Sequence, residues 1–461
     1  MKRRRLLAAA AAAAALAGCS LTPDYKRPAS PLEAAYPEGS AAQGAALPAA
    51  DAFFADPVVA RLASEAVKTS REMRSALLAV ERAQALYTTS RADLFPEIHA
   101  GADAPAAKLP DNNFDTHVSA YGLGLGFAAY ELDLFGRVRA EAAAARESAR
   151  AAALDAASTR ITLQAEAAAL YLRLVASREE LDTAKASAEN RRRGAELAAN
   201  RRALGLASEL EAAQAKALYY EAASRIASAA ESEEKAMNAL ELLIGAPLPQ
   251  DLPKRRRLAD VTPFAEVPAG LPSELLERRP DVLAAEHRLM AAGEKLGAAR
   301  AARLPSISLT GGLGLASGSL GDLLESGSSA WIAAPIIDIP LFDAGKRAAR
   351  ETAAEKELGM AQADWERTAQ KAFSEVSDAL AARHRASERL AAEEGRAASA
   401  ASALSAAKSR HEAGLEGYMP VLDAERTLLS AQSAAIDARL ARETGAVTLY
   451  KALGGGWEKR Q

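Results

Sequence analysis

Few side chains in this chain have the types and spacing that chemistry requires. The five histidines are scattered without the spacing of metal-binding motifs. They are His99, His117, His287, His384 and His411. No glycine-rich loop follows a strand-like run and opens a helix, as a phosphate-binding loop would. We therefore expect no catalytic residue, no metal site and no cofactor. What remains is one cysteine near the N-terminus and a set of charges beside two glycine-containing turns.

The single cysteine, Cys19, closes an N-terminal segment that resembles a bacterial lipobox. Residues 2–5 are basic, residues 6–16 are apolar, and Leu-Ala-Gly precedes the cysteine. This pattern predicts a signal peptide over residues 1–18, with cleavage before Cys19 and lipid on its thiol. Two or three acyl chains would give stable anchoring. Ser20 stands where an inner-membrane retention signal would have Asp, so we expect the outer membrane. An ordinary signal peptide with an incidental cysteine is the alternative.

The charge of the chain is nearly balanced, with 57 basic and 60 acidic side chains in 461 residues. Nothing in this balance indicates nucleic acid. The basic run at residues 254–257 is interpreted as a solvated linker, with nucleic-acid contact as the weaker alternative. After the N-terminal segment we find no run of about 18 apolar residues, so we expect that any membrane-spanning segment is a strand.

Similar residues recur at a fixed distance along the chain, which predicts a tandem duplication. Three pairs are offset by 209 residues and a fourth by 207. They are Phe95-Pro96 with Leu304-Pro305, Gly205-Leu206 with Gly414-Leu415, Leu243-Ile244-Gly245 with Ala452-Leu453-Gly454, and Leu134 with Leu341. The unit is far longer than the repeats of about 20–50 residues in solenoids. We expect an extended tether over 19–50, repeat 1 over 51–250, a linker over 251–270 and repeat 2 over 271–461.

Each repeat contains runs in which apolar residues alternate with small or polar ones, the period-two pattern of a β-strand. The runs are residues 121–129 and 306–315 and, more weakly, 97–104 and 331–340. One face of such a strand can contact lipid while the other faces water, as in a transmembrane barrel. Residues 109–113 and 317–329 are expected to be the loops of the two strand pairs. The edge of a soluble β-sandwich is the alternative, because alternation alone is a weak signal.

Long runs rich in Ala, Glu, Arg, Leu and Lys predict long helices after each strand pair. Residues 137–246 contain no proline, and residues 342–461 contain only Pro420. A turn at Gly205 or Gly414 divides each run into a helix of about 65 residues, about 100 Å long, and a return helix of about 40. A further helical stretch is expected over residues 51–94. A cytosolic coiled coil would leave the strands and the signal peptide unexplained.

Four strands per chain are too few for a membrane barrel, because single-chain barrels begin at about eight. Open sheet edges are not tolerated in hydrocarbon, so several copies should close one barrel. Three copies would give 12 strands around an open lumen. We therefore expect an α+β membrane protein, a trimeric 12-stranded β-barrel continued by a long α-helical periplasmic tunnel and built from two tandem repeats. Such an assembly is a conduit.

Several motifs resemble those of outer-membrane efflux proteins, the TolC-like outer membrane factors, in their lipoprotein branch. The resemblance covers essentially the whole mature chain. Its main segments are residues 130–137 (YELDLFGR), 271–281 (LPSELLERRPD), 299–309 (ARAARLPSISL), 339–345 (IPLFDAG), 422–426 (LDAER) and 452–457 (ALGGGW). Co-linear motifs of this length are highly specific.

The resemblance implies a homotrimer in the bacterial outer membrane, in contact with outer-membrane lipid. It also implies two protein partners: a periplasmic adaptor and an inner-membrane pump of the resistance-nodulation-division class. The chain is then no enzyme, and it passively conducts drugs or other small toxic compounds that the pump selects. A type I secretion exit duct and a structural envelope lipoprotein without an open pore are the alternatives.

In this family the glycine-containing turns lie at the periplasmic end of the tunnel, where the helices converge and close it. By position in the resemblance, Arg410, Asp423 and Arg426 match gate charges, and Met419 occupies an apolar constriction. His411 lies where relatives often carry Tyr. Ordinary exposed helix charges are the alternative for each gate charge.

The turns themselves are the candidates for contact with the adaptor, through Gly205 and Ser208 in the first and Gly414 and Gly417 in the second. The two turns differ in charge. Residues offset by 209 from Asp423 and Arg426 are Gln214 and Ala217. We therefore expect the second turn to contribute more to gating and the first to form more of the fixed wall.

Overall fold

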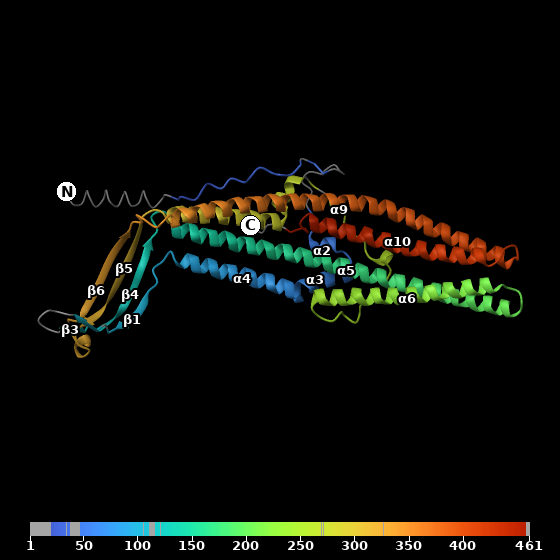
Figure 1. Ribbon diagram of the computed structural model, residues 1–461, viewed down its shortest axis with the longest axis horizontal. Helices are drawn as coiled ribbons and strands as arrows, with labels where there is room; N and C mark the ends of the chain where they lie inside the picture. The colour runs from blue at the N-terminus through green and yellow to red at the C-terminus, as the bar shows by residue number, and fades with distance from the viewer. Residues whose placement is uncertain are drawn as a thin grey trace. The chain divides into compact units, whose positions relative to one another are not determined.

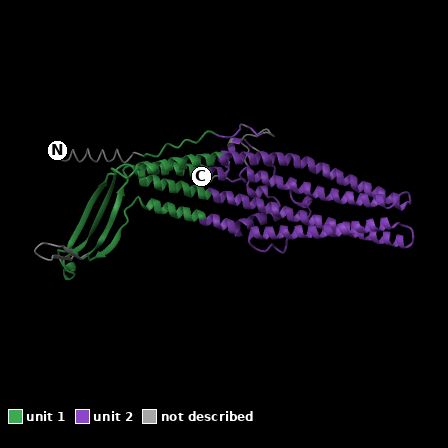
Figure 2. Cartoon of the chain, viewed as in Figure 1, with its two compact units in different colours: residues 1–29, 79–153, 284–366 green, residues 30–78, 154–283, 367–461 purple. Residues whose placement is uncertain are grey.

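A computed structural model of the chain is mostly helical (Figure 1). It describes residues 20–33, 35–36, 47–104, 106–109, 116–119, 121–268, 270, 272–325 and 327–457. The chain divides into two compact units, each made of three separate segments (Figure 2). Unit 1 comprises Met1–Ala29, Ala79–Ala153 and Ala284–Glu366, and unit 2 comprises Ser30–Leu78, Leu154–Leu283 and Arg367–Gln461.

Two long helices, α5 (Arg137–Ala203) and α9 (Lys346–Glu412), have 67 residues each. They are followed by the shorter helices α6 (Glu209–Ile244) and α10 (Met419–Ala452). The predicted pairs of long and return helices are therefore confirmed. The remaining helices are α2 (Ala50–Phe53), α3 (Pro57–Thr69), α4 (Arg71–Ala92), α7 (Leu275–Arg278) and α8 (Pro280–Ala301). None of the described helices is long and apolar enough to cross a membrane.

Helices in the two halves of the chain match in length. α4 and α8 have 22 residues each, and α5 and α9 have 67 each. The first residues of both pairs, Arg71 with Pro280 and Arg137 with Lys346, are 209 positions apart. Tandem duplication stays a prediction, which these equal lengths support.

The helical stretch predicted over residues 51–94 is broken into three helices. Asp56 caps the start of α3, because its side chain accepts hydrogen bonds from the N–H groups of Val58 and Val59. Pro57 is the first residue of α3, a position that proline favours. Ser70 separates α3 from α4, and its hydroxyl accepts from the N–H of Met73 at 3.2 Å. Two capping side chains thus interrupt a segment whose composition alone reads as one helix.

Four antiparallel strands form the sheet of unit 1, in the order β1-β4-β5-β6. They are β1 (His99–Asp103), β4 (Tyr121–Leu132), β5 (Ser306–Ser317) and β6 (Ser329–Asp338). The four predicted strands are thereby confirmed to within a few residues. Leu125 of β4 lies opposite Leu313 of β5, which lies opposite Trp331 of β6, so these apolar side chains share one face. β1 and β6 each have a single neighbour in this sheet.

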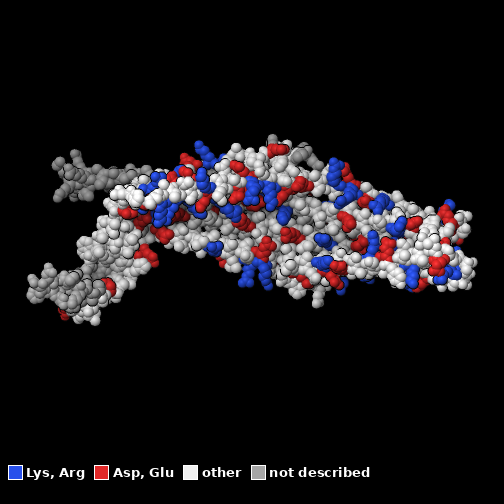
Figure 3. Space-filling model, in the orientation of Figure 1, with Lys and Arg blue, Asp and Glu red and all other residues white. Residues whose placement is uncertain are grey.

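Glycines permit β4 and β5 to approach closely on the other face. Gly124 and Gly314 are paired, and a Cβ on Gly314 would lie 2.3 Å from the carbonyl oxygen of Leu123. On the apolar face Leu313 and Trp331 are 68% and 81% exposed in the single chain. Figure 3 shows few charged side chains over the sheet and many of both signs over the helices. In β4 and β5 the alternation in the sequence therefore separates a face of bulky apolar side chains from a face of small residues.

A second sheet was not predicted. It pairs β2 (Ala106–Leu109) with β3 (Thr116–Ser119). The prediction of a loop over residues 109–113 is wrong for Leu109, which is the last residue of β2. Residues 110–113 lie outside the described part of the chain. Strands of four residues carry too few alternations for a period to be recognised.

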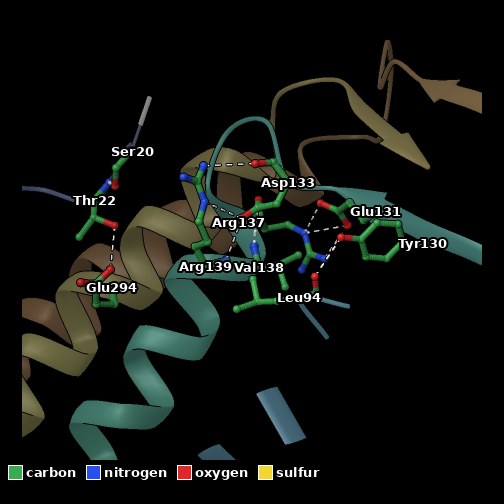
Figure 4. A network of polar contacts seen from close by, with 10 residues as sticks. All are labelled: Ser20, Thr22, Leu94, Tyr130, Glu131, Asp133, Arg137, Val138, Arg139 and Glu294. Atoms are coloured by element: carbon green, nitrogen blue, oxygen red, sulfur yellow. Dashed lines mark hydrogen bonds and ion pairs between the residues drawn. The ribbon is translucent and has the colours of Figure 1, made fainter. Parts of the chain in front are cut away.

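Charged side chains fix the junction from β4 into α5, shown in Figure 4. Asp133 accepts hydrogen bonds from the N–H groups of Val138 at 3.2 Å and Arg139 at 2.9 Å, at the start of the helix. Arg137 donates to both carboxylate oxygens of Glu131, at 2.9 and 2.6 Å. The motif over residues 130–137 therefore joins a strand to a helix.

The first described residues lie against α8, within unit 1. Thr22 donates to Glu294 at 2.9 Å (Figure 4), and both Tyr25 and Arg27 donate to the buried Glu286 at 2.7 Å. A Cβ on Gly297 would lie 2.7 Å from the Cα of Thr22, so only glycine leaves room for this segment. The predicted tether is thus docked at its beginning, while Cys19 itself lies outside the described residues.

Unit 2 has an aromatic core that joins distant parts of the chain. The rings of Phe53 and Tyr450 stack with centroids 3.8 Å apart, and Phe264 stacks on Phe53 at 5.3 Å. Nearby, the fully buried Asp56 is held by the guanidinium of Arg256. The prediction that residues 254–257 form a solvated linker is wrong for Arg256, because this ion pair holds its side chain in the core.

Candidate functional site at the two helical turns

The turns between the long and the return helices lie in unit 2 and end their helices in the same way. Gly205 and Gly414 adopt the left-handed conformation, with φ of 74° and 72°. The N–H groups of Leu206 and Leu415 each donate to the carbonyl five residues earlier, at 2.8 and 3.0 Å. This is the Schellman arrangement, which favours glycine because a side chain strains the left-handed region. Both predicted glycines are therefore turn-forming residues.

The return helices begin differently in the two turns. Ser208 and Glu211 form a capping box at the start of α6, with bonds of 3.2 and 2.9 Å. The corresponding position in the second turn is Gly417, which is exposed, and the helix α10 starts after Tyr418 without a side-chain cap. Ser208 thus holds the first turn in place, whereas the start of α10 is held by packing.

That packing joins the two hairpins. Ala198 of α5, Ala215 of α6 and Leu422 of α10 are buried together, and Tyr418 and Met419 pack against them. Met419, predicted at a constriction, is therefore half-buried against its own chain. The small alanines let the helices approach closely at this level.

Tyr418 is seated over a glycine that the sequence analysis did not single out. A Cβ on Gly194 of α5 would lie 2.4 Å from the phenol oxygen of Tyr418. Burial and, to a lesser degree, the charge of Glu425 raise the pKa of Tyr418. An isolated glycine inside a helical run was the available signal for this contact.

The predicted gate charges form local pairs within the single chain. Asp423 and Arg426 lie 3.4 Å apart on α10, and both side chains are about two-thirds exposed, at 65% and 63%. Arg410 instead pairs with Glu416 at 2.7 Å. The structure therefore brings Asp423 and Arg426 together and places Arg410 in a separate pair in the turn.

A buried charge beneath the turns was missed by sequence analysis. The side chain of Arg191, on α5, is only 1% exposed; it donates to the carbonyl of Leu218 at 3.0 Å and lies 3.7 Å from Glu221. Burial lowers the pKa of Arg191, although Glu221 and Glu425 oppose that change. Glu425 itself is buried and pairs with Lys408 of α9 at 3.1 Å. Charges from all four hairpin helices thus meet below the turns.

His411 connects the two turns. Its Nε2 lies 3.3 Å from Nη1 of Arg201, and its Nδ1 lies 3.1 Å from the carbonyl oxygen of Glu416. Its ring lies 5.1 Å from that of Tyr418, so this position makes an aromatic contact. These residues line a pocket of about 170 Å³ between the turns.

Both turns expose large apolar side chains. Leu204 and Leu206 of the first turn are 73% and 66% exposed, and Leu415 of the second is 70% exposed. Among the described residues no group of three or more histidines, cysteines or acidic side chains could hold a metal ion. The exposed leucines therefore leave apolar surface at both turns.

Comparisons with known proteins agree with one another. A family model described as outer membrane efflux protein matches residues 62–246 and 271–455, two segments whose first residues are 209 positions apart. The solvent efflux pump outer membrane protein SrpC of Pseudomonas putida is 39% identical, over 97% of this chain and 97% of its own. The outer membrane protein OprJ of Pseudomonas aeruginosa is 37% identical, over 96% and 94%.

Solved structures give the same result. The open state of the MtrE outer membrane channel of Neisseria gonorrhoeae superimposes with a TM-score of 0.86 at 34% identity, over 95% of this chain and 98% of that one. A membrane protein from Pseudomonas aeruginosa superimposes with a TM-score of 0.89 at 35% identity, over 95% and 98%.

Proposed function

Because the chain belongs to the outer membrane efflux protein family, we propose that it forms the exit channel of a tripartite efflux pump. The channel passively conducts drugs or other small toxic compounds from the periplasm to the exterior, and the pump supplies energy and selectivity. One observation carries the proposal: a single chain joins a sheet with two open edges to two long helical hairpins that end in paired turns. No step in this function calls for a reactive side chain.

The open edges favour a homotrimer. β1 and β6 each lack a second neighbour in the four-stranded sheet, and unpaired edges are costly in hydrocarbon. Joining β6 of one copy to β1 of the next would close a barrel of 12 strands from three chains, with the uncharged leucine face toward lipid. The mass of the detergent-solubilised protein tests this, and a monomer that still conducts would contradict it.

The conduction itself is the first test. The purified protein should carry current in planar bilayers and admit small solutes into liposomes. A sealed bilayer would instead favour a structural envelope lipoprotein. In cells, loss of the protein should increase drug susceptibility, whereas lost export of a protein with unchanged susceptibility would favour a type I secretion duct.

The turns are the proposed docking face for a periplasmic adaptor that belongs to a resistance-nodulation-division pump. Three exposed leucines lie beside the predicted contact residues Gly205, Ser208, Gly414 and Gly417, and apolar side chains at such density favour a protein partner. A photoreactive group at position 417 should cross-link to the hairpin of a cognate adaptor. Placed at Lys235, which is 74% exposed on α6, the same group should not, and equal labelling at both would contradict docking at the turns.

Lipid on Cys19 is proposed to anchor the chain in the outer membrane. Thr22 is fixed against α8 by Glu294 and Gly297, so only Ser20 and Leu21 separate the proposed anchor from a docked residue. The mass of the peptide that begins at Cys19 tests the modification. An unmodified thiol in membrane-extracted protein would exclude it.

A further inference from the structure

The two hydrogen bonds of His411 define its protonation state. The carbonyl oxygen of Glu416 can only accept, and the guanidinium of Arg201 can only donate. The ring must therefore carry its proton on Nδ1, 3.1 Å from the carbonyl, and present a lone pair on Nε2, 3.3 Å from the guanidinium. The contact between the turns exists only with neutral histidine.

Protonation would turn this contact from attraction to repulsion. A second proton on Nε2 would face the N–H of Arg201, so that two donors and two positive charges lie about 3 Å apart. Histidine is the side chain that changes its charge between about pH 5 and 8. Acid therefore removes the bond, and neutral or alkaline pH keeps it.

Arg201 is the charged group that the Nε2 side of the ring contacts directly, at 3.3 Å. The two carboxylates that line the same pocket are already engaged: Glu211 accepts from the N–H of Ser208 at 2.9 Å, and Glu416 pairs with Arg410 at 2.7 Å. Tyr418, the other titratable group beside the ring, is neutral in this range, because the ordinary pKa of tyrosine is about 10 and burial raises the pKa of Tyr418 further. The added charge thus faces Arg201.

We propose that His411 is a proton-sensitive link between the two hairpins, which acidification of the periplasm releases. Arg201 belongs to the first hairpin and His411 to the second, so losing their bond frees the second turn to move away from the first. Loss of a hydrogen bond to a charged group changes such an equilibrium about tenfold. The consequence for conduction, an easier opening at low pH, rests on the proposed channel function.

Spin labels test the link without reference to conduction. Leu206→Cys and Leu415→Cys place one label on each turn, at exposed positions, and protein carrying only Cys19 gives the labelling background. Samples are diluted with unlabelled chains, so that each measured distance joins two labels on the same protomer. Between pH 8 and pH 5.5 the population with separated turns should increase about tenfold.

Two substitutions decide the interpretation. In His411→Gln the amide keeps both hydrogen bonds but cannot gain a proton, so the distance should stay short at both pH values. His384→Gln removes an exposed histidine of the same helix, 3.5 Å from Glu388, and should respond like the unmodified chain. The proposal would be overturned if the distance between the two labels did not change with pH in the parent protein. It would also be overturned if that distance changed with pH as much in His411→Gln as in the parent. A pH-dependent distance in a protein that carries no current would sustain the link and refute the channel.

Discussion

Alanine at both Asp423 and Arg426 should raise the single-channel conductance of the reconstituted protein severalfold. In the proposed trimer three copies of each charge surround the axis at the closed end, where they can pair with neighbouring hairpins. Both side chains are about two-thirds exposed and are therefore available for such contacts. Within one chain an exposed pair of this kind contributes only about 0.3–0.5 kcal/mol, so its removal should leave the fold intact. Bilayer recordings measure the effect.

A matched pair of charges on another helix provides the control. Glu231 and Lys235 of α6 lie 2.5 Å apart, are 63% and 74% exposed, and stand away from the turns. Alanine at both should leave conductance unchanged. Conductance that stays at the parental level in the Asp423 and Arg426 variant, or that rises equally in both variants, would show that these charges do not form a gate.

Replacing Asp56 by alanine should destabilise the protein by about 3–5 kcal/mol, because it leaves the guanidinium of Arg256, which is only 13% exposed, without its carboxylate. Asp56 is fully buried, holds Arg256 and accepts from the N–H of Thr262 at 3.1 Å, besides capping α3. The change should appear as a lower midpoint in urea unfolding. Asp56→Asn separates the two roles, since asparagine still caps a helix but lacks the charge. If Asp56→Asn is as stable as the parent, the ion pair is not the source of the stability.

The same residue makes stability depend on pH. Burial raises the pKa of Asp56, but hydrogen bonds from Arg256, Thr262 and Val59 outweigh it and leave the pKa below its ordinary value. A carboxyl with a lowered pKa contributes its full stability above about pH 4, the unfolded value, and loses it as pH falls through the folded value. The stability difference between parent and Asp56→Asn should therefore shrink below about pH 4. A difference that is the same at pH 7 and pH 3 would contradict this.

The strands and long helices could be predicted because their patterns extend over many residues. Four strands and two helical hairpins follow from alternation and from the absence of proline. The breaks at Asp56 and Ser70 could not, since each depends on one side chain turning back to the backbone. Strands β2 and β3 are too short to show a period.

At the site, Gly205 and Gly414 were predictable from their place between two helical runs. Arg191 and Glu425 were not, because each is one charge among many on a helix and only packing shows which one is buried. Tyr418 stood inside the turn sequence, but its partner Gly194 lies far away along the chain. The recurrence at 209 positions aligned the two turns but gave no sign that His411 contacts Arg201.

The equal lengths of α5 and α9 constrain how this chain can change in evolution. Helix α5 follows β4 and α9 follows β6, both of which pair with β5, and Arg201 contacts His411 near the other ends of the helices. One extra turn in α5 alone would carry its tip about 5.4 Å past its counterpart. Insertions and deletions in one of these helices must therefore be matched by equal changes in the other.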